Sequence, residues 1–153
     1  MTEYEYSFNA SSIEPYIEYC KKNNYINKSV TNENRVVYHN DTLKHVIARI
    51  TTKEGVTTLD FKNKNNEDKE LLISTESLPL IINDNMETIK SMLETLEFYE
   101  AANNTRIRHV YEKDNVKFEI DDYIKPKMCV IGLEGAKEEV DKVYNELKEI
   151  VKE

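Results

Sequence analysis

Six stretches of the chain alternate between apolar and charged side chains, and this alternation constrains the fold more than any other feature. Successive side chains of a β-strand point to opposite faces, so each stretch predicts a strand with one apolar and one charged face. In the first stretch, residues 3–8, the apolar face carries Tyr4, Tyr6 and Phe8. The charged faces carry, in chain order, Glu3 and Glu5; Arg49 and Lys53; Asp60 and Lys62; Arg106 and Arg108; Lys117, Glu119 and Asp121; and Glu134.

Three amphipathic helices are expected between and after the strands. Residues 11–14 indicate a capping box, and apolar residues then recur at helical spacing to about Asn23. A second helix is expected to begin at Asp84 or Asn85, and a third follows Gly135. Strands are predicted over 3–8, 35–39, 44–53, 57–64, 70–75, 97–112, 116–123 and 127–134, with a charged loop over 63–69.

Two architectures satisfy this pattern. An open antiparallel sheet would pack helices on its apolar face and leave its charged face in water. A closed barrel would turn the apolar face outward, under the helices, and line a polar lumen with the charged face. Closure removes the sheet edges, and about seven or eight strands are enough to close. The position of a residue within a strand does not distinguish a lumen from bulk water, so the pattern leaves both architectures open.

The composition argues against several functional classes. The 153 residues are expected to form a single domain over 1–153, and 21 Lys and Arg against 29 Asp and Glu give a net charge of −8. Such a chain is a poor binder of duplex nucleic acid or of an anionic membrane. Cys20 and Cys129 lie far apart and indicate neither a disulfide framework nor a zinc site. No apolar run resembles a membrane span or a signal peptide, so we expect a cytoplasmic protein.

If the charged faces meet around a lumen, their side chains indicate a phosphate ligand carried together with its metal. Mg²⁺ binds carboxylate oxygens and shares the phosphate oxygens of its substrate. Arginine and lysine donate charge-assisted hydrogen bonds to phosphate. Taken singly, each basic residue is more often one half of a surface ion pair between strands. The candidate metal ligands are Glu3, Glu5, Glu119, Asp121 and Glu134, and the candidate phosphate donors are Arg49, Lys62, Arg106 and Arg108.

In this order, the motifs resemble those of the CYTH, or triphosphate tunnel metalloenzyme, family. Glu3-Tyr4-Glu5-Tyr6-Ser7 resembles the family's N-terminal E-x-E-x-K strand, and Ile47-Ala48-Arg49-Ile50-Thr51 is similar to its L-R-I-R strand. Further resemblances are Arg35–Thr42 to the second strand and its turn, Leu59–Lys62 to the next basic strand, Arg106–Tyr111 to K-x-R-x-x-Y, Phe118–Tyr123 to the acidic strand, and Gly132–Gly135 to E-x-E-G. The resemblance covers nearly the whole chain and favours the tunnel over the open sheet.

The resemblance implies an α+β fold, a closed antiparallel β-barrel of about eight strands that forms a tunnel under three covering helices. Family members use Mg²⁺ or Mn²⁺ to hydrolyse inorganic triphosphate, nucleoside or organic triphosphates such as thiamine triphosphate, or RNA 5′-triphosphate ends, and some cyclise ATP. At the positions that match the family motifs, the resemblance implies Glu3, Glu5 and Glu134 as metal ligands, with Asp121 or Glu119 helping. The phosphates would be bound by Arg49, Lys62, Arg106, Arg108 and Arg35, and the residues expected in catalysis are Glu5, Arg49 and Lys62.

Three positions depart from the family pattern. Ser7 replaces a lysine, Thr51 an arginine and Gly132 a glutamate. Each lost cation removes charge-assisted hydrogen bonds worth about 1.5–3 kcal/mol. The leading hypothesis is a metal-dependent hydrolase of a triphosphate-containing substrate. The alternatives are a class IV-type adenylate cyclase that makes cyclic AMP, and a tunnel that binds a nucleotide or triphosphate without turnover.

Overall fold

The computed structural model describes residues 2–65, 71–125 and 127–151. The strands are β1 (Thr2–Ala10), β2 (Ile26–His39), β3 (Val46–Lys53), β4 (Val56–Lys64), β5 (Leu71–Glu76), β6 (Leu80–Ile81), β7 (Tyr99–Lys113), β8 (Val116–Lys125) and β9 (Met128–Gly135). The helices are α1 (Glu14–Lys22), α2 (Met86–Thr95) and α3 (Lys137–Val151). None of these helices is both long and apolar enough to cross a lipid bilayer within the part of the chain that is described.

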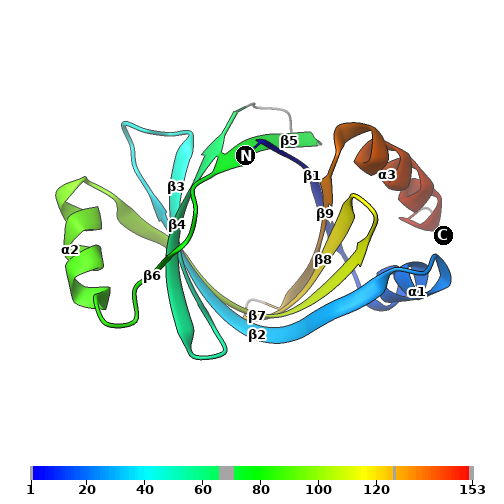
Figure 1. Cartoon of the computed structure of the whole chain (residues 1–153), viewed down its shortest axis with the longest axis horizontal. Coiled ribbons are helices and arrows are strands. Elements are labelled where there is room, and N and C mark those ends of the chain that lie inside the picture. The colour runs from blue at the N-terminus through cyan, green and yellow to red at the C-terminus, as the bar shows by residue number, and fades with distance from the viewer. Residues whose placement is uncertain (1, 66–70, 126, 152–153) are drawn as a thin grey trace.

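The strands close into an antiparallel barrel, which confirms the predicted tunnel (Figure 1). Around the barrel they follow the order β3-β2-β7-β8-β9-β1-β5-β4, and pairing of β4 with β3 completes the ring. The short strand β6 pairs with β4 at Thr58 and Leu59 and lies outside this ring of eight strands. Closure leaves the eight strands of the ring without a free edge.

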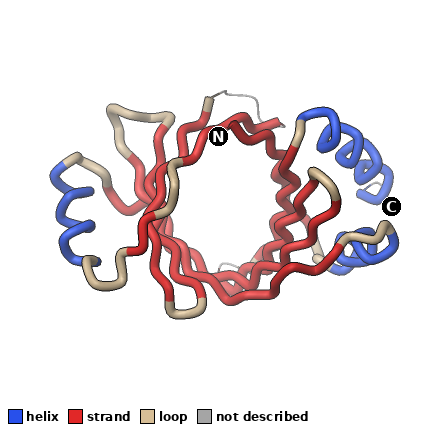
Figure 2. Tube along the Cα trace, in the orientation of Figure 1, coloured by secondary structure: helices blue, strands red, loops and turns tan. Residues whose placement is uncertain are grey.

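The helices lie on two opposite sides of the barrel (Figure 2). On one side, α1 and α3 pack on β8 and β9 around Phe118, Ile131 and Leu133, which are fully buried. On the other side, α2 buries Ile89 and Leu93 against β2, β3 and β4. Burial of one such side chain contributes about 1.5–3 kcal/mol. The two hydrophobic cores therefore lie between the barrel and its helices, and most of the residues that face inward are polar.

Several elements differ from the sequence-based prediction. β2 begins at Ile26 instead of near residue 35, because its pairing with β7 satisfies the backbone of a polar stretch that shows no alternation. The predicted capping box is wrong: α1 begins at Glu14, whose N–H donates to Oγ of Ser12 at 3.3 Å. β3 begins at Val46, and β6 was not expected. The predicted loop over 63–69 starts later, since β4 runs to Lys64, and residues 66–70 lie outside the described residues.

Candidate functional site

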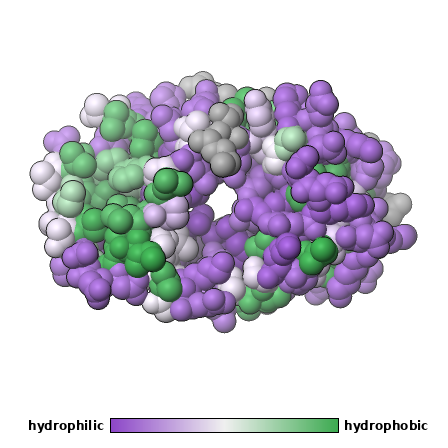
Figure 3. All heavy atoms as spheres, viewed as in Figure 1, coloured by the Kyte–Doolittle hydropathy of each residue, from purple (hydrophilic) through white to green (hydrophobic). Residues whose placement is uncertain are grey.

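The charged strand faces meet inside the barrel, around a cavity of about 590 Å³. A channel ringed by hydrophilic side chains opens at the centre of the molecule (Figure 3). All the residues that the sequence predicted for the site line this cavity: Glu3, Glu5, Arg35, Arg49, Lys62, Arg106, Arg108, Glu119, Asp121 and Glu134. The other charged lining residues are Lys53, Asp60, Glu76 and Lys117. Acidic and basic side chains are therefore equal in number in the described lining.

Three glutamates on the neighbouring strands β1 and β9 form an acidic group, called here the glutamate cluster. Glu5 and Glu134 face each other in the β1–β9 ladder, and Glu3 follows on the same face of β1. One carboxylate oxygen from each residue lies within 4.8 Å of the other two. Like charges at this distance disfavour ionisation unless a cation shares them. The cluster therefore has the geometry of a cation site.

Burial shifts the titration of two members of the glutamate cluster. Burial, followed by the adjacent carboxylate of Glu134, raises the pKa of Glu3 to about 8. Burial also raises the pKa of Glu5 to about 7, although the nearby Lys62 ammonium opposes the shift. Oε2 of Glu3 is buried and accepts no hydrogen bond from a described residue, and the Lys62 ammonium lies 3.8 Å away. A buried carboxylate oxygen without a donor, among other oxygen ligands, fits Mg²⁺ or Mn²⁺.

Lys117 supplies a permanent positive charge beside the glutamate cluster. Its ammonium lies 2.7 Å from Oε1 of Glu134 and 3.9 Å from Oε2 of Glu119. Burial alone would lower the pKa of Lys117, but these two carboxylates outweigh it and raise the pKa. Lys117 therefore stays charged at neutral pH and offsets part of the negative charge of the cluster.

Arg49 and Lys62, on β3 and β4, share a carboxylate in the cavity. Nε of Arg49 donates to Oδ1 of Asp60 at 2.9 Å, and Nη2 donates to the second oxygen of Asp60 and to Oε1 of Glu76 at 3.0 Å. The Lys62 ammonium lies 3.8 Å from the same oxygen of Glu76. Asp60 thus fixes the plane of the guanidinium through a two-point contact. Glu76 lies between two cations, a position that favours an anion.

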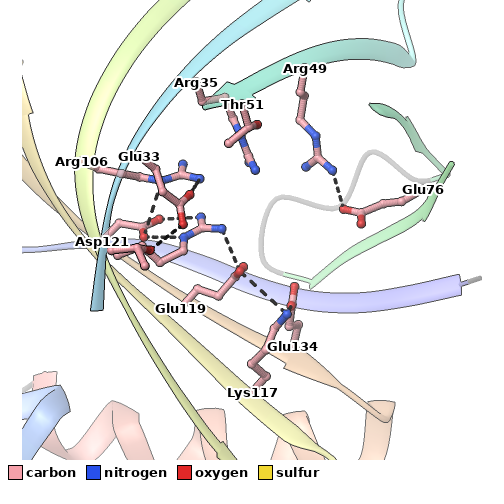
Figure 4. Close-up of polar contacts among 12 residues, drawn as sticks. Glu33, Arg35, Arg49, Thr51, Glu76, Arg106, Lys117, Glu119, Asp121 and Glu134 are labelled. Carbon is pink, nitrogen blue, oxygen red and sulfur yellow. Dashed lines mark hydrogen bonds and ion pairs between the residues drawn. The ribbon is translucent and has the colours of Figure 1, made fainter. Parts of the chain in front are cut away.

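Arg35 is the lumen arginine that has no carboxylate partner among the described residues. Its Nε donates to Oγ1 of Thr51 at 3.0 Å, across the β2–β3 ladder (Figure 4). Burial, and then the positive charges of Arg106, Arg49 and Arg108, lower the pKa of Arg35 to about 10. Its guanidinium nevertheless stays charged at neutral pH. A half-buried cation surrounded by other cations is stabilised when an anion binds.

Arg106 and Arg108 are held by carboxylates from β2 and β8. Nη2 of Arg106 donates to Oε1 of the buried Glu33 at 3.0 Å. Nε and Nη2 of Arg108 donate to the two oxygens of Asp121 at 2.8 and 2.9 Å, and Nη1 donates to Glu119 at 2.8 Å. Burial alone would raise the pKa of Glu119, but the positive charges around it, of which Arg108 contributes most, together outweigh burial and lower the pKa. Glu119 and Asp121, expected to help hold the metal, therefore contact arginines and lie outside the glutamate cluster.

Four charged residues hold lumen cations and carboxylates in place, and the sequence does not reveal these roles. Asp60 and Lys117 were placed on charged strand faces, but nothing in the sequence identified their partners. Glu33 shares a face with Arg35, yet the stretch before it shows no alternation that would indicate a strand. Glu76 ends β5, one residue beyond the predicted strand. The missed residues are Glu33, Asp60, Glu76 and Lys117.

Two of the three departures from the family pattern are neighbours in the barrel. Ser7 and Gly132 face each other in the β1–β9 ladder, and both line the cavity. A lysine and a glutamate at these positions would therefore be neighbours. Their joint absence removes one charge of each sign, keeps the lumen balanced and widens it at this point. Thr51, the third departure, accepts the hydrogen bond from Arg35.

Comparison with known proteins shows the fold. No family model and no curated protein matches the sequence. The PH1012 protein of Pyrococcus horikoshii has a similar structure, with a TM-score of 0.77 and 17% identity over 95% of this chain and 88% of that chain. HpAC1 of Hippeastrum, described as a candidate adenylyl cyclase with a dominant triphosphatase activity, gives a TM-score of 0.68 and 15% identity over 96% and 87%.

A chain of the Mediator head module of Schizosaccharomyces pombe is also similar, with a TM-score of 0.67 and 9% identity over 99% of this chain and 96% of that chain. One fold can carry unrelated functions, so similarity at these identities establishes the architecture alone. The chain shares the closed β-barrel fold of these proteins, and conclusions about function rest on the residues of its own lumen.

Proposed function

We propose that this protein is a metal-dependent hydrolase of a triphosphate-containing substrate that binds in the lumen of the barrel. The observation that carries the proposal is the convergence of two unlike groups in one cavity of about 590 Å³. The glutamate cluster offers oxygen ligands, one of them buried and without a donor. Arg35, Arg49 and Lys62 offer donors to an anion. A polyanion carried with its metal satisfies both groups, whereas a bare cation or a bare anion satisfies only one.

The glutamate cluster would hold Mg²⁺ or Mn²⁺. When bound, the metal would neutralise charge on the phosphate oxygens and polarise a phosphoryl group. Binding of the metal requires ionised carboxylates, so Glu3 and Glu5 must lose the protons that their raised pKa values favour. The Lys117 ammonium, 2.7 Å from Oε1 of Glu134, would offset part of the negative charge of the cluster.

Three basic side chains of the lumen, Arg35, Arg49 and Lys62, would bind and orient the phosphates. Arg35 has donors free of carboxylates, and Arg49 is already oriented by Asp60. A phosphate oxygen between Arg49 and Lys62 would replace the carboxylate of Glu76. Phosphoryl transfer depends mainly on positioning and on stabilisation of charge over the phosphate oxygens, so fixed cations around the transferred group supply much of the acceleration. Attack by water on the terminal phosphoryl group would release orthophosphate.

Carboxylates would keep two further lumen arginines, Arg106 and Arg108, in place. Glu33 holds Arg106, and Asp121 with Glu119 holds Arg108, all through direct hydrogen bonds. A rigid site loses little conformational entropy when its ligand binds. The fold shared with HpAC1, which is described as having triphosphatase activity, supports hydrolysis as the first reaction to test.

Phosphate release from a substrate panel tests this function. The panel contains tripolyphosphate, thiamine triphosphate, the four ribonucleoside triphosphates and a 5′-triphosphorylated RNA, each with Mg²⁺, Mn²⁺ or a chelator. We expect metal-dependent release of orthophosphate, and we expect Glu5→Gln to reduce it about hundredfold or more. Glu18→Gln removes a similar carboxylate from the exposed face of α1 and serves as the matched control.

The same reactions separate the alternatives. Cyclic AMP with pyrophosphate among the products would identify a cyclase, and tight binding of a ligand that is recovered intact would identify a binding protein. Release that is unaffected by Glu5→Gln, or no release with either metal, would contradict the proposed hydrolase.

A further inference from the structure

A second cavity, of about 370 Å³, adjoins the charged one. The two cavities share residues from β1, β2, β3, β4, β7 and β8: Glu5, Ser7, Arg35, Arg49, Lys62, Arg106 and Tyr123. We propose that this second cavity binds the uncharged organic group of an organic triphosphate, so that the substrate is an ester such as a nucleoside triphosphate and not inorganic triphosphate. The inference rests on the proposed function and assigns the substrate class for the same lumen.

Among the described residues that line the second cavity and not the charged one, Lys64 is charged, Ser74 and Asn104 are polar, and Val37, Ile47, Leu72 and Ile73 are apolar. Val37, Ile47 and Leu72 belong to the inward faces of β2, β3 and β5, since each faces a lumen residue across a ladder: Arg49, Lys62 and Glu5, respectively. In the charged cavity, the apolar side chains of the described lining are confined to Pro79 and Val130. A bare polyphosphate gains nothing from contact with apolar surface, whereas burial of an organic group against that surface is favourable.

A buried hydroxyl at this cavity has no partner. Ser74 is 1% exposed, and its Oγ makes no hydrogen bond with a described residue. It lies on the same face of β5 as Leu72 and lines the second cavity. A buried polar atom that stays unpaired costs about 1–3 kcal/mol, so a ligand that supplies a hydrogen bond here removes a penalty of the empty site. Asn104 and the ring of Tyr123 add polar and aromatic surface for such a group.

The position of the second cavity fits the order of groups along an organic triphosphate. Glu3 and Glu134 of the glutamate cluster line the charged cavity and not the second one, whereas Arg35, Arg49 and Lys62 line both. A ligand with its terminal phosphate near the glutamate cluster would pass these cations and end in the second cavity. The volume lies within the range of about 300–1,000 Å³ for sites of small organic ligands.

The test compares the best ribonucleoside triphosphate of the panel with methyl triphosphate, which keeps the charged chain but lacks the bulk of the organic group. We expect the nucleotide to have the higher kcat/KM. Ser74→Val should lower the ratio of the two kcat/KM values about three- to tenfold, the effect of one lost hydrogen bond. Ile47→Phe, which fills the second cavity, should lower the same ratio by more. Thr75→Val makes a similar change on the opposite face of β5 and should leave the ratio as in the wild type.

The outcomes separate the two proposals. Equal kcat/KM for both ligands, with a ratio unchanged by Ser74→Val and Ile47→Phe, would overturn the organic-group cavity while hydrolysis stands. Hydrolysis of tripolyphosphate with neither ester hydrolysed would also overturn the organic-group cavity while the proposed function stands. If no member of the panel is hydrolysed, the proposed function fails, and calorimetric titration of the two ligands with Mn²⁺ then tests the cavity alone. Tighter binding of the nucleotide that Ile47→Phe abolishes would support the cavity, and equal affinities would overturn it.

Discussion

Without metal, the protein should lose stability as the pH rises from 5 to 8.5, the reverse of what a surface carboxylate causes. The pKa of Glu5 rises from 4.5 to about 7 and that of Glu3 to about 8. A carboxyl group whose pKa is higher in the folded state binds more protons when folded than when unfolded. Its contribution is therefore present below its unfolded pKa and is lost as the pH rises through the folded pKa.

The structure gives the size of this effect. One pKa unit corresponds to about 1.4 kcal/mol, so the shift of Glu5 alone corresponds to about 3 kcal/mol. Glu3 and Glu5 interact through the same cluster, so their contributions overlap. We therefore expect the free energy of unfolding to fall by about 2–4 kcal/mol across this range. Added Mn²⁺ should restore stability at pH 8 more than at pH 5, because protons compete with the metal for the same oxygens.

Urea unfolding in the presence of a chelator, at half-unit steps of pH, measures the effect. The double variant Glu3→Gln/Glu5→Gln removes both titrating groups and should show a nearly flat profile over the same range. Glu18→Gln, exposed on α1, should follow the wild type. If the wild-type protein gains stability as the pH rises, or if its difference from the double variant is constant with pH, the glutamates are not strained by burial and the reasoning is refuted.

Three further changes test the packing that supports the lumen. Arg106→Met should lower the free energy of unfolding by about 3–5 kcal/mol, because it leaves Glu33 buried without its 3.0 Å partner, and adding Glu33→Gln should recover part of the loss in the same urea assay. Gly135→Ala should be strongly destabilising in thermal unfolding, since a Cβ there would lie 1.9 Å from a backbone oxygen of the β7–β8 turn. Gly132→Ala is the control: its Cβ would meet only ordinary contacts at 3.5 Å, so this variant should be tolerated. Leu93→Ala should cost about 2–5 kcal/mol by opening the core under α2; a loss below about 1 kcal/mol would mean that α2 contributes little to the barrel.

The alternation of side chains carried most of the fold prediction. It placed Tyr4, Tyr6 and Phe8 against a helix, and all three pack on the core that α1 and α3 form with β8 and β9. It also assigned the charged residues to faces that meet in the lumen. The alternation could not tell a lumen from open water, because both accept charged side chains. The closed barrel was favoured over the open sheet because the motifs, in their order along the chain, resemble those of the tunnel family.

The first half of β2 could not be predicted from the sequence pattern. Residues 26–34 are polar except for Ile26 and Val30 and do not alternate, and their strand conformation comes from long-range pairing with β7. Irregular register at Asn27/Ser29 and at Val37/Tyr38 further obscures the faces of this strand. Glu33, the buried partner of Arg106, was missed for this reason. The partner of each lumen cation likewise depends on strand register across the closed barrel, which a single sequence does not encode locally.

A crystal structure of the protein with Mn²⁺ and the non-hydrolysable imidotriphosphate tests the central claim most directly. Anomalous scattering locates the manganese independently of the rest of the density. We expect one strong manganese peak at the carboxylates of Glu3, Glu5 and Glu134, with phosphate oxygens at Arg35 and Arg49 inside the barrel. Manganese confined to exposed carboxylates, with no phosphate density in a lumen that keeps its internal ion pairs, would contradict the proposed site.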